Sequence, residues 1–155
     1  MLFKGKIDNL ADCEKLVELL INLLTPNTFL LLQGELGVGK TTLTQLIANK
    51  LGIKEKVNSP TFTICQRYQI KNDYYLNHFD FFRLNTSDKL EFFQEITVDN
   101  LNIIEWPEKN PQFWEKEKYI QLKLVKKNLK TRLISLNINF SVNDLQKTKI
   151  TGFFT

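Results

Sequence analysis

The sequence predicts an α/β domain with a mixed β-sheet flanked by helices, in which antiparallel hairpins are added to a parallel core. Two observations carry this prediction. A short apolar run is followed directly by a glycine-rich loop and then by a helical pattern, an order typical of parallel sheets. Further along the chain, two segments alternate apolar and polar residues on either side of a short turn, as antiparallel hairpins do.

The first expected elements are a helix and a buried strand. Apolar residues that recur at alternating steps of three and four predict an amphipathic helix over residues 10–24. Asn9 and Asp12 are placed as a capping pair at its start. The run TFLLLQ, residues 28–33, is bounded by turn residues and predicts a strand that is buried on both faces.

A second helix and a first hairpin should follow the glycine-rich loop. One apolar stripe runs from Thr41 to Leu51, and Gly52 is suited to a left-handed C-terminal cap. Residues 61–70 and 74–82 then alternate apolar and polar side chains around a short polar turn. We therefore expect an antiparallel hairpin in this part of the chain.

The next segment has weaker signals. A helix is expected to start at Thr86 or Ser87, and LNII, residues 101–104, predicts another buried strand. Asn110 and Pro111 resemble a cap followed by proline at the first position of a brief helix.

The last expected elements form a second hairpin. Alternating apolar residues predict strands over residues 120–124 and 134–140, with a lysine-rich turn at 126–130. Because this connection is short, the two strands should pair antiparallel. We assign a single domain to residues 1–140 and expect residues 141–155 to be a mobile C-terminal tail.

The composition limits the class of protein. The chain has 155 residues, of which 43% are hydrophobic and 25% are charged, which is typical of one globular domain. No apolar run approaches the roughly 20 residues of a membrane span, and the N-terminus lacks the apolar segment of a secretory signal. We expect a cytoplasmic protein with no membrane contact. The net charge of +4 permits attraction to RNA but is too small to indicate it.

The glycine-rich loop QGELGVGKTT contains the phosphate-binding motif GxxxxGK[ST]. Backbone N–H groups of such a loop converge on phosphate oxygens, helped by the positive end of the next helix. Lys40 would reach the β and γ phosphates, and the Thr41 hydroxyl would bind Mg²⁺. The domain is therefore predicted to be P-loop NTPase-like. The predicted nucleotide-binding residues are Glu35, Leu36, Gly37, Val38, Gly39, Lys40, Thr41 and Thr42.

Hydrolysis also needs an acidic residue at a neighbouring strand end and a group that orients the attacking water. Asp80 and Glu105 each end an apolar segment, and Thr61 follows the loop where many P-loop enzymes place a γ-phosphate sensor. Each also has a structural interpretation, as a solvated carboxylate or a turn residue. Trp106 and His78 lie beside these positions, and from pattern alone both are expected to be packed.

Four segments together resemble the bacterial TsaE (YjeE) family. These segments are GELGVGKTTL, SPTFT, HFDFFRL and IIEWPE, in the family's order and approximate spacing, within residues 10–140. The resemblance implies a P-loop ATPase of tRNA threonylcarbamoyladenosine (t6A) synthesis that uses ATP and Mg²⁺. It would act with the proteins TsaB and TsaD on adenosine 37 of tRNA, hydrolyse ATP slowly when alone, and contact tRNA through the complex. It would not itself transfer the threonylcarbamoyl group.

The resemblance also implies roles for individual residues. Lys40, Thr61 and Asp80 would be catalytic, with Thr61 as the γ-phosphate switch and Asp80 as the residue that organises water or metal. Thr41 and Glu105 would hold Mg²⁺.

Other implied roles concern the borders of the site. Trp106 would form an active-site wall or a partner contact, and Arg132 would border the adenine. The chain departs from the usual family pattern at Phe62 and Phe82, where tyrosine is common, and in a shortened segment over residues 90–105. These departures put the geometry of the partner contact in doubt more than ATP binding.

Two other functions stay open on the sequence. One is a small P-loop kinase that transfers the γ phosphate to an acceptor, and the other is a nucleotide-dependent scaffold that does not hydrolyse ATP. Only three arginines, Arg67, Arg83 and Arg132, are available to a kinase lid, and the DxxG and NKxD elements of guanine-specific switches do not occur.

Overall fold

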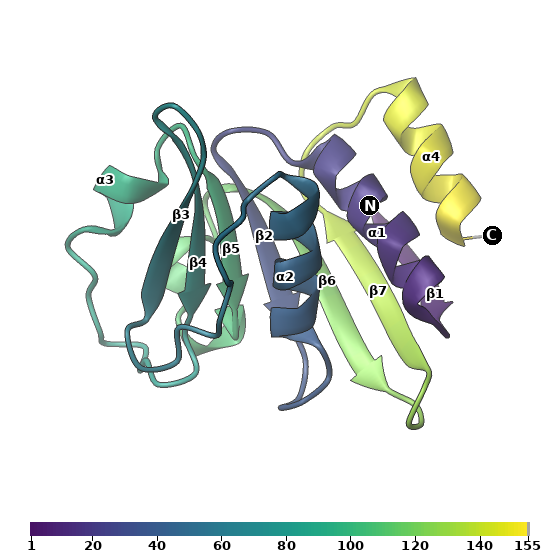
Figure 1. Cartoon of the computed structure of the whole chain (residues 1–155), viewed down its shortest axis with the longest axis horizontal. Helices are drawn as coiled ribbons and strands as arrows, with labels where there is room; N and C mark the ends of the chain where they lie inside the picture. Colours follow the sequence, from purple (N-terminus) through teal and green to yellow (C-terminus); the bar gives the residue numbers. More distant parts are fainter. Residues whose placement is uncertain (155) are drawn as a thin grey trace.

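The computed structural model of the chain describes residues 1–154, which form one mixed sheet with helices against it (Figure 1). The described residues contribute seven strands in the order β1-β7-β6-β2-β5-β4-β3. The elements are β1 Leu2–Ile7, α1 Leu10–Leu23, β2 Thr28–Gln33, α2 Lys40–Lys50, β3 Cys65–Lys71, β4 Tyr74–Asp80, α3 Phe93–Thr97, β5 Leu101–Glu105, the 3₁₀ helices η1 Pro107–Lys109 and η2 Pro111–Phe113, β6 Lys118–Lys126, β7 Arg132–Ile138 and α4 Asp144–Phe154.

The centre of the sheet is parallel and its margins are antiparallel. Strand β2 pairs in parallel with both β5 and β6, and β4 pairs in parallel with β5. Hairpins add β7 next to β6 and β3 next to β4, both antiparallel. The predicted mixed α/β fold is confirmed, and both expected hairpins are present.

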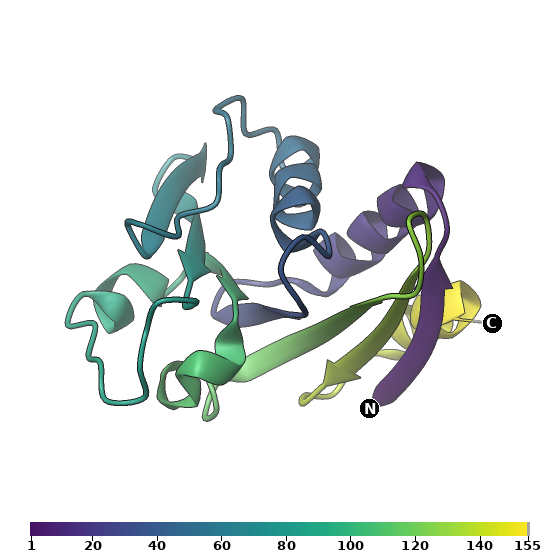
Figure 2. The same ribbon diagram turned by 90° about the horizontal axis from the view of Figure 1, so that it is seen from below.

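Helices α1 and α2 cover one face of the sheet, and the short helices after β4 and β5 lie on the other (Figure 2). The Asn9 side chain accepts a hydrogen bond from the Asp12 backbone N–H at 2.9 Å, so the expected cap of α1 is present. Side chains of β2 alternate between the two layers. Leu30 and Leu32 join the core beneath α1 and α2, whereas Phe29 and Leu31 pack with Phe93 of α3.

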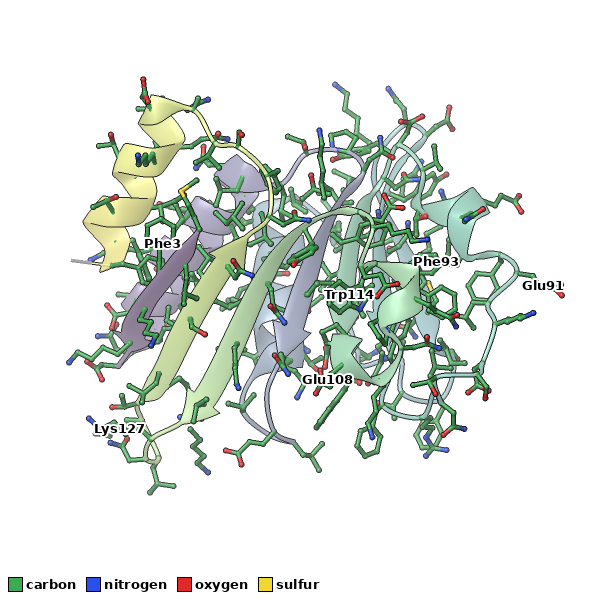
Figure 3. The ribbon with its side chains drawn as sticks, turned by 180° about the vertical axis from the view of Figure 1, so that it is seen from behind. Phe3, Glu91, Phe93, Glu108, Trp114 and Lys127 are labelled. Atoms are coloured by element: carbon green, nitrogen blue, oxygen red, sulfur yellow. The ribbon has the colours of Figure 1, made fainter. Side chains whose placement is uncertain are left out.

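The second face is covered only over part of its width. Seen from behind, α3, η1 and η2 lie over the β2-β5-β4 side, and no helix lies over β6, β7 and β1 (Figure 3). The middle of β6 and β7 directs polar side chains to this open side, including Gln121 and Asn137, and the apolar Val125 and Leu133 follow near the β6–β7 turn. The open part of the sheet is therefore stable in water without a covering layer.

The two ends of the chain differ from the expectation. Residues 2–7 form an edge strand that was not predicted, paired antiparallel with β7. The C-terminal segment, expected to be a mobile tail after residue 140, instead forms α4, which packs on α1 and β1. Ile150 is fully buried in the main core, and Phe154 stacks on Phe3 with ring centroids 5.7 Å apart. At the start of α4, the side chains of Asn143 and Gln146 each accept a hydrogen bond from the other residue's backbone N–H. This reciprocal cap, a polar pair three residues apart, is the sequence signal that could have predicted the helix.

The predicted start of the next helix, at Thr86 or Ser87, is also wrong. Asn85 and Asp88 form a tight turn, and the Asn110 side-chain amide donates to both of their carbonyls. The Asn110 side chain therefore holds residues 85–88 in this turn, and no helix begins there. The helix is the five-residue α3, which begins at Phe93.

Burial of α4 gives a test of stability. We expect Ile150→Ala to lower the free energy of unfolding by about 2–4 kcal/mol, because it empties a fully buried site in the core. Leu145→Ala, on the same helix but with 66% of the side chain exposed, should change it by less than about 0.5 kcal/mol. Urea unfolding of both variants distinguishes a packed helix from a tail, since a tail would leave both unchanged.

Candidate functional site

The glycine-rich loop is held by close packing at its start and by backbone conformation at its end. An added Cβ at Gly34 would lie 2.5 Å from the Leu124 carbonyl oxygen of β6, so only glycine fits between the two strands. Gly39 has φ +115° where α2 begins, a conformation that favours glycine. The loop therefore turns sharply, and its backbone N–H groups lie at the N-terminus of α2.

Lys40 is folded back onto its own loop. Its ammonium donates hydrogen bonds to the carbonyls of Gly34 at 2.7 Å and Glu35 at 2.9 Å. It also lies 4.0 Å from the centre of the Trp106 ring, a cation–π contact. Burial lowers the pKa of Lys40, and the negative charges of Glu105 and Asp80 oppose this shift. A cation in this position is available to an anionic group entering the pocket.

Glu105 is oriented from two sides. Its Oε1 accepts a hydrogen bond from Thr41 Oγ1 at 2.9 Å, and the same oxygen lies 2.8 Å from His78 Nε2. His78 is fully buried on β4, as expected of a packed and hydrogen-bonded histidine. The carboxylate at the end of β5 is thus fixed next to the start of α2.

Asp80 sits beside Glu105 in register on the neighbouring parallel strand. Its Oδ2 accepts hydrogen bonds from Ser59 Oγ at 2.9 Å and from Thr61 Oγ1 at 2.8 Å. Its Oδ1 accepts the backbone N–H of Phe82 at 2.9 Å. The segment that carries Thr61 is therefore tied to the end of β4 through one carboxylate.

These groups surround one cavity of about 390 Å³ at the carboxyl ends of the parallel strands. Trp106 has a left-handed backbone conformation with φ 57°, and its ring packs against Phe82 at 5.0 Å to form one wall. The cavity is lined by Leu36, Gly37, Gly39, Lys40, Thr41, Thr42, Ser59, Thr61, Asp80, Phe82, Glu105 and Trp106.

The chain matches the family model "Threonylcarbamoyl adenosine biosynthesis protein TsaE" over residues 7–134. The chain belongs to the TsaE family. The resemblance indicated by four sequence segments is confirmed.

Individual relatives agree with this assignment. A protein of Nostoc described as "tRNA threonylcarbamoyladenosine biosynthesis protein TsaE" is 35% identical over 150 residues, which cover 90% of this chain and 91% of that one. A protein of Haemophilus influenzae with the same description is 37% identical over 100 residues, and the match spans 63% of its length. The crystal structure of Bacillus subtilis YdiB superposes with a TM-score of 0.69 at 24% identity, covering 99% of this chain and 94% of that one, so the fold is shared.

Three of the residues predicted to bind nucleotide do not line the cavity. Glu35 and Val38 contribute backbone to the loop, and the Glu35 and Val38 carbonyls accept from Lys40 and Arg132. Arg132 Nε donates to the Val38 carbonyl at 3.0 Å, so this guanidinium braces the loop from the start of β7. Its predicted place beside the adenine stays a prediction.

Sequence reasoning missed two members of the site. Ser59 precedes the predicted Thr61 by two residues and shares its carboxylate partner. Phe82 was noted only as a departure from the family pattern, yet its ring packs on Trp106 and lines the cavity. The serine could have been found from the SPT segment, because short hydroxyl side chains before proline commonly bond nearby groups.

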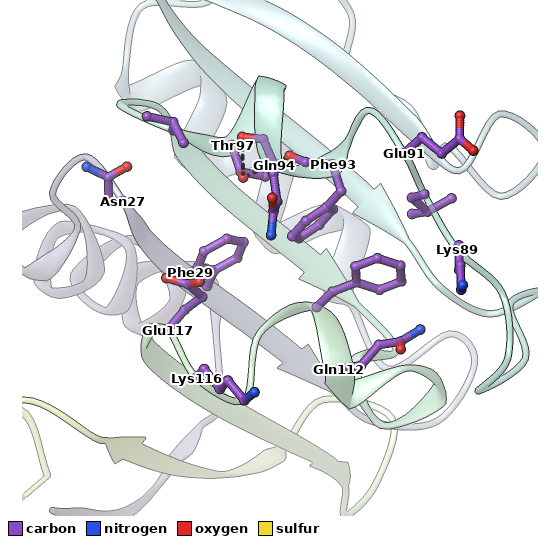
Figure 4. Close-up of a pocket in the computed structure, with 13 residues that line it drawn as sticks. Asn27, Phe29, Lys89, Glu91, Phe93, Gln94, Thr97, Gln112, Lys116 and Glu117 are labelled. Atoms are coloured by element: carbon purple, nitrogen blue, oxygen red, sulfur yellow. Dashed lines mark hydrogen bonds between the residues drawn. The ribbon is translucent and has the colours of Figure 1, made fainter.

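A second cavity, of about 680 Å³, lies on the opposite face of the sheet beneath α3 and η2 (Figure 4). Phe29, Phe93 and Phe113 form its apolar side, and lysine, glutamate and glutamine side chains stand around it. It contains neither the glycine-rich loop nor the paired strand-end carboxylates. The candidate active site is therefore the smaller cavity.

The donor atoms of Thr41 and Glu105 fit Mg²⁺. A hydroxyl and a carboxylate are hard oxygen ligands, and they lie within 2.9 Å of each other. Within residues 1–154 there is no group of three or more His, Cys, Asp and Glu side chains arranged to hold a metal. Mg²⁺ suits such a sparse site, because it takes its remaining ligands from phosphates and water.

None of the helices in the described part of the chain is long and apolar enough to cross a membrane.

Removal of the Thr41 hydroxyl tests whether this residue is a ligand of Mg²⁺. We expect Thr41→Val to lose about tenfold or more of the gain in ATP affinity that Mg²⁺ gives, because one oxygen ligand and its hydrogen bond to Glu105 are removed. Calorimetric titration with Mg²⁺ and with EDTA measures this gain.

Thr42→Val is the matched control for the Mg²⁺-dependent gain, since Thr42 is the next residue of α2 and its hydroxyl makes no hydrogen bond within the described residues. The assignment fails if the two variants respond alike to Mg²⁺.

Proposed function

We propose that this chain is a Mg²⁺-dependent ATPase subunit that acts with TsaB and TsaD in forming threonylcarbamoyladenosine at position 37 of tRNA. It would support the reaction without catalysing the transfer. Membership of the TsaE family and the content of the pocket support this function. The pocket has a full set of phosphate-binding groups, and its lining has no arginine lid of the kind that small kinases use.

The observation that carries the proposal is the register between Asp80 and Glu105. These residues pair across parallel strands β4 and β5, so both carboxylates emerge at the same sheet edge. The strand β2, which leads into the glycine-rich loop, pairs with β5 on its other side. Two acids thereby face the loop, and we assign Glu105 to the metal and Asp80 to the water.

ATP binding would move Lys40. Its ammonium now bonds two carbonyls of its own loop and lies over Trp106. Phosphate oxygens offer charge-assisted bonds that are stronger than bonds to neutral carbonyls, so the β and γ phosphates would draw the ammonium into the cavity. Backbone N–H groups at the start of α2 would bind the remaining phosphate oxygens.

Thr41 and Glu105 would hold Mg²⁺, with His78 keeping the carboxylate in place. When bound, the ion would offset charge on the β and γ phosphates. The hydrogen bond from His78 matters because a fixed ligand oxygen costs no reorganisation when the metal arrives.

Asp80 would orient the attacking water, and its present bonds would account for the slow turnover that we expect of the isolated subunit. One of its oxygens accepts from Ser59 and Thr61, and the other accepts from the Phe82 backbone. Because Oδ2 already accepts two hydrogen bonds, a water molecule would have to bind at Oδ1 beside the Phe82 N–H. Movement of residues 59–61, through a γ phosphate near Thr61 or through a partner, would free the carboxylate and raise the rate.

Two substitutions separate binding from turnover. We expect Lys40→Ala to abolish triphosphate binding, and Asp80→Ala to keep most of the binding while turnover falls by ~10²-fold or more, because water positioning is lost. Nucleotide affinity and phosphate release are measured on both proteins.

Asp73→Ala, an exposed carboxylate in the turn between β3 and β4, is the control and should match the parent chain. Equal losses of binding and turnover in Asp80→Ala, in protein that remains folded, would refute its assignment to water.

Reconstitution of the tRNA modification reaction tests the proposed role of the chain. With TsaB, TsaD, ATP and unmodified tRNA, modified adenosine should form only when this chain is present with Lys40 intact, and ATP hydrolysis should be faster than for the chain alone. Labelled γ phosphate on an acceptor would instead indicate a kinase. Absence of cleavage in single-turnover assays with partners present would indicate a scaffold.

A further inference from the structure

The charges of the chain are divided between two parts of the fold. Residues 1–7 and 118–143, which contain β1, β6 and β7, carry eight of the 21 lysines and arginines and none of the 17 acidic residues. The remaining residues hold 13 basic against 17 acidic side chains. The modest overall charge therefore hides a wholly basic part and an acidic part.

The basic strands are also the ones whose second face has no helix over it (Figure 3). Their pairing register places Gln33, Lys123, Ser135 and Lys4 in one row across β2, β6, β7 and β1. The next row contains Gln121 and Asn137, and a shallow depression of about 230 Å³ lies between the rows. We call the surface formed by Lys4, Gln33, Gln121, Lys123, Ser135 and Asn137 the basic face.

The lysines of these strands are free to bind a ligand. Arg132 is bonded to backbone carbonyls and Lys6 to Asp8. The other six lysines form no ion pair or side-chain hydrogen bond within residues 1–154; they are Lys4, Lys118, Lys123, Lys126, Lys127 and Lys130. Three of them surround the β6–β7 turn, where Figure 3 shows Lys127 at the edge of the basic face.

We propose that the basic face and the adjoining β6–β7 turn bind the phosphate backbone of double-helical RNA, with tRNA as the occupant. The choice of tRNA rests on the proposed function. Lysines along two strands would contact successive phosphates, and the amide and hydroxyl groups between them would donate hydrogen bonds to phosphate and ribose oxygens.

The chemistry of the face favours RNA over an acidic protein. Protein interfaces are rich in arginine and aromatic anchors and poor in lysine, whereas this face has lysine, amide and hydroxyl side chains, with Leu2 as the apolar residue that lines its depression. Contacts to phosphates need charge spread over a surface, which Lys4 and Lys123 supply on the basic face and Lys127 supplies at the adjoining turn.

The face also favours a duplex over a single strand. Single-stranded nucleic acids stack their bases on exposed aromatic rings. The aromatic side chain that β6 directs to this side is Tyr119, and its ring packs edge-on against Trp114 at 5.3 Å. The ring is half-buried, and one of its sides is taken by this contact.

The test compares two triple variants of the full chain that remove the same charge. K4Q/K123Q/K127Q changes the basic face, and K54Q/K56Q/K89Q removes three exposed lysines elsewhere. Binding of unmodified tRNA is measured by fluorescence anisotropy between 50 and 200 mM KCl. We expect the first variant to bind at least about tenfold more weakly, with a salt slope smaller by about two to three, and the second to stay within about threefold of the parent.

Several results would overturn the inference. These are equal losses in the two variants, no tRNA binding by the parent chain, binding of oligouridine as tight as binding of tRNA, or displacement of tRNA by polyglutamate at equal charge concentration. The first would indicate net charge alone, and the last an acidic protein partner.

Nucleotide binding by the same proteins separates this inference from the proposed function. The face variant should bind ATP as the parent does, and Lys40→Ala should bind tRNA as the parent does. If partner-stimulated hydrolysis is absent while the lysine effect persists, the proposed function fails and the RNA surface stands; the opposite pattern refutes the RNA surface alone.

Discussion

The site depends on the register of β5 between β2 and β4. Leu32, Glu105 and Asp80 are aligned across these three parallel strands, so the glycine-rich loop and both carboxylates share one edge and one face of the sheet. A slip of one residue would turn Glu105 to the opposite face. The register is fixed at the other end of the strands by a buried hydrogen bond of 2.9 Å from Asn77 to Asn102. Asn102 also donates to the carbonyl that ends α3, which ties the short helix to the same pairing.

Much of this arrangement could be predicted from the sequence, because its signals are local. The TFLLLQ run, the glycine motif and the helical stripe after it are contiguous, and they identified β2, the loop and α2. The two hairpins followed from alternation around short turns. The family segments brought Asp80, Thr61 and Glu105 into the site, and all three line the cavity. Each of these correct predictions rested on a pattern contained within about ten consecutive residues.

The failures involve contacts between distant segments. In strand β1, Gly5 occupies a position that faces inward. A side chain would not fit there, because Phe154 of α4 fills the space. Its alternation is therefore incomplete, and the pattern becomes clear only with α4 in place. Helix α4 itself buries Ile150 but leaves Leu145 exposed, so its apolar stripe is short. Arg132 was expected near a ligand, and its bond to Val38 depends on the β6–β7 hairpin lying beside the glycine-rich loop.

The sheet divides the molecule into two chemical halves. On the β2-β5-β4 side, both faces are covered and the strands are almost wholly buried, which gives the candidate site a rigid support. On the β6-β7-β1 side, one face is left to solvent and the buried residues of β6 and β7 alternate with exposed or half-buried ones. Because β2 pairs with both β5 and β6, a single continuous sheet carries the candidate site at its edge and an uncovered surface on its back.

The Arg132 brace limits where the chain can change in length. Surface turns usually accept extra residues, because their ends are held only by the strands they connect. The turn after Lys126 is different, since Arg132 holds the Val38 carbonyl and the Thr131 hydroxyl donates to Asp8 at 2.8 Å. An inserted residue here would have to bulge outward with both bonds intact, or release the loop that carries Lys40. Natural length variation in this family should therefore avoid residues 131 and 132 and collect at the tip of the turn.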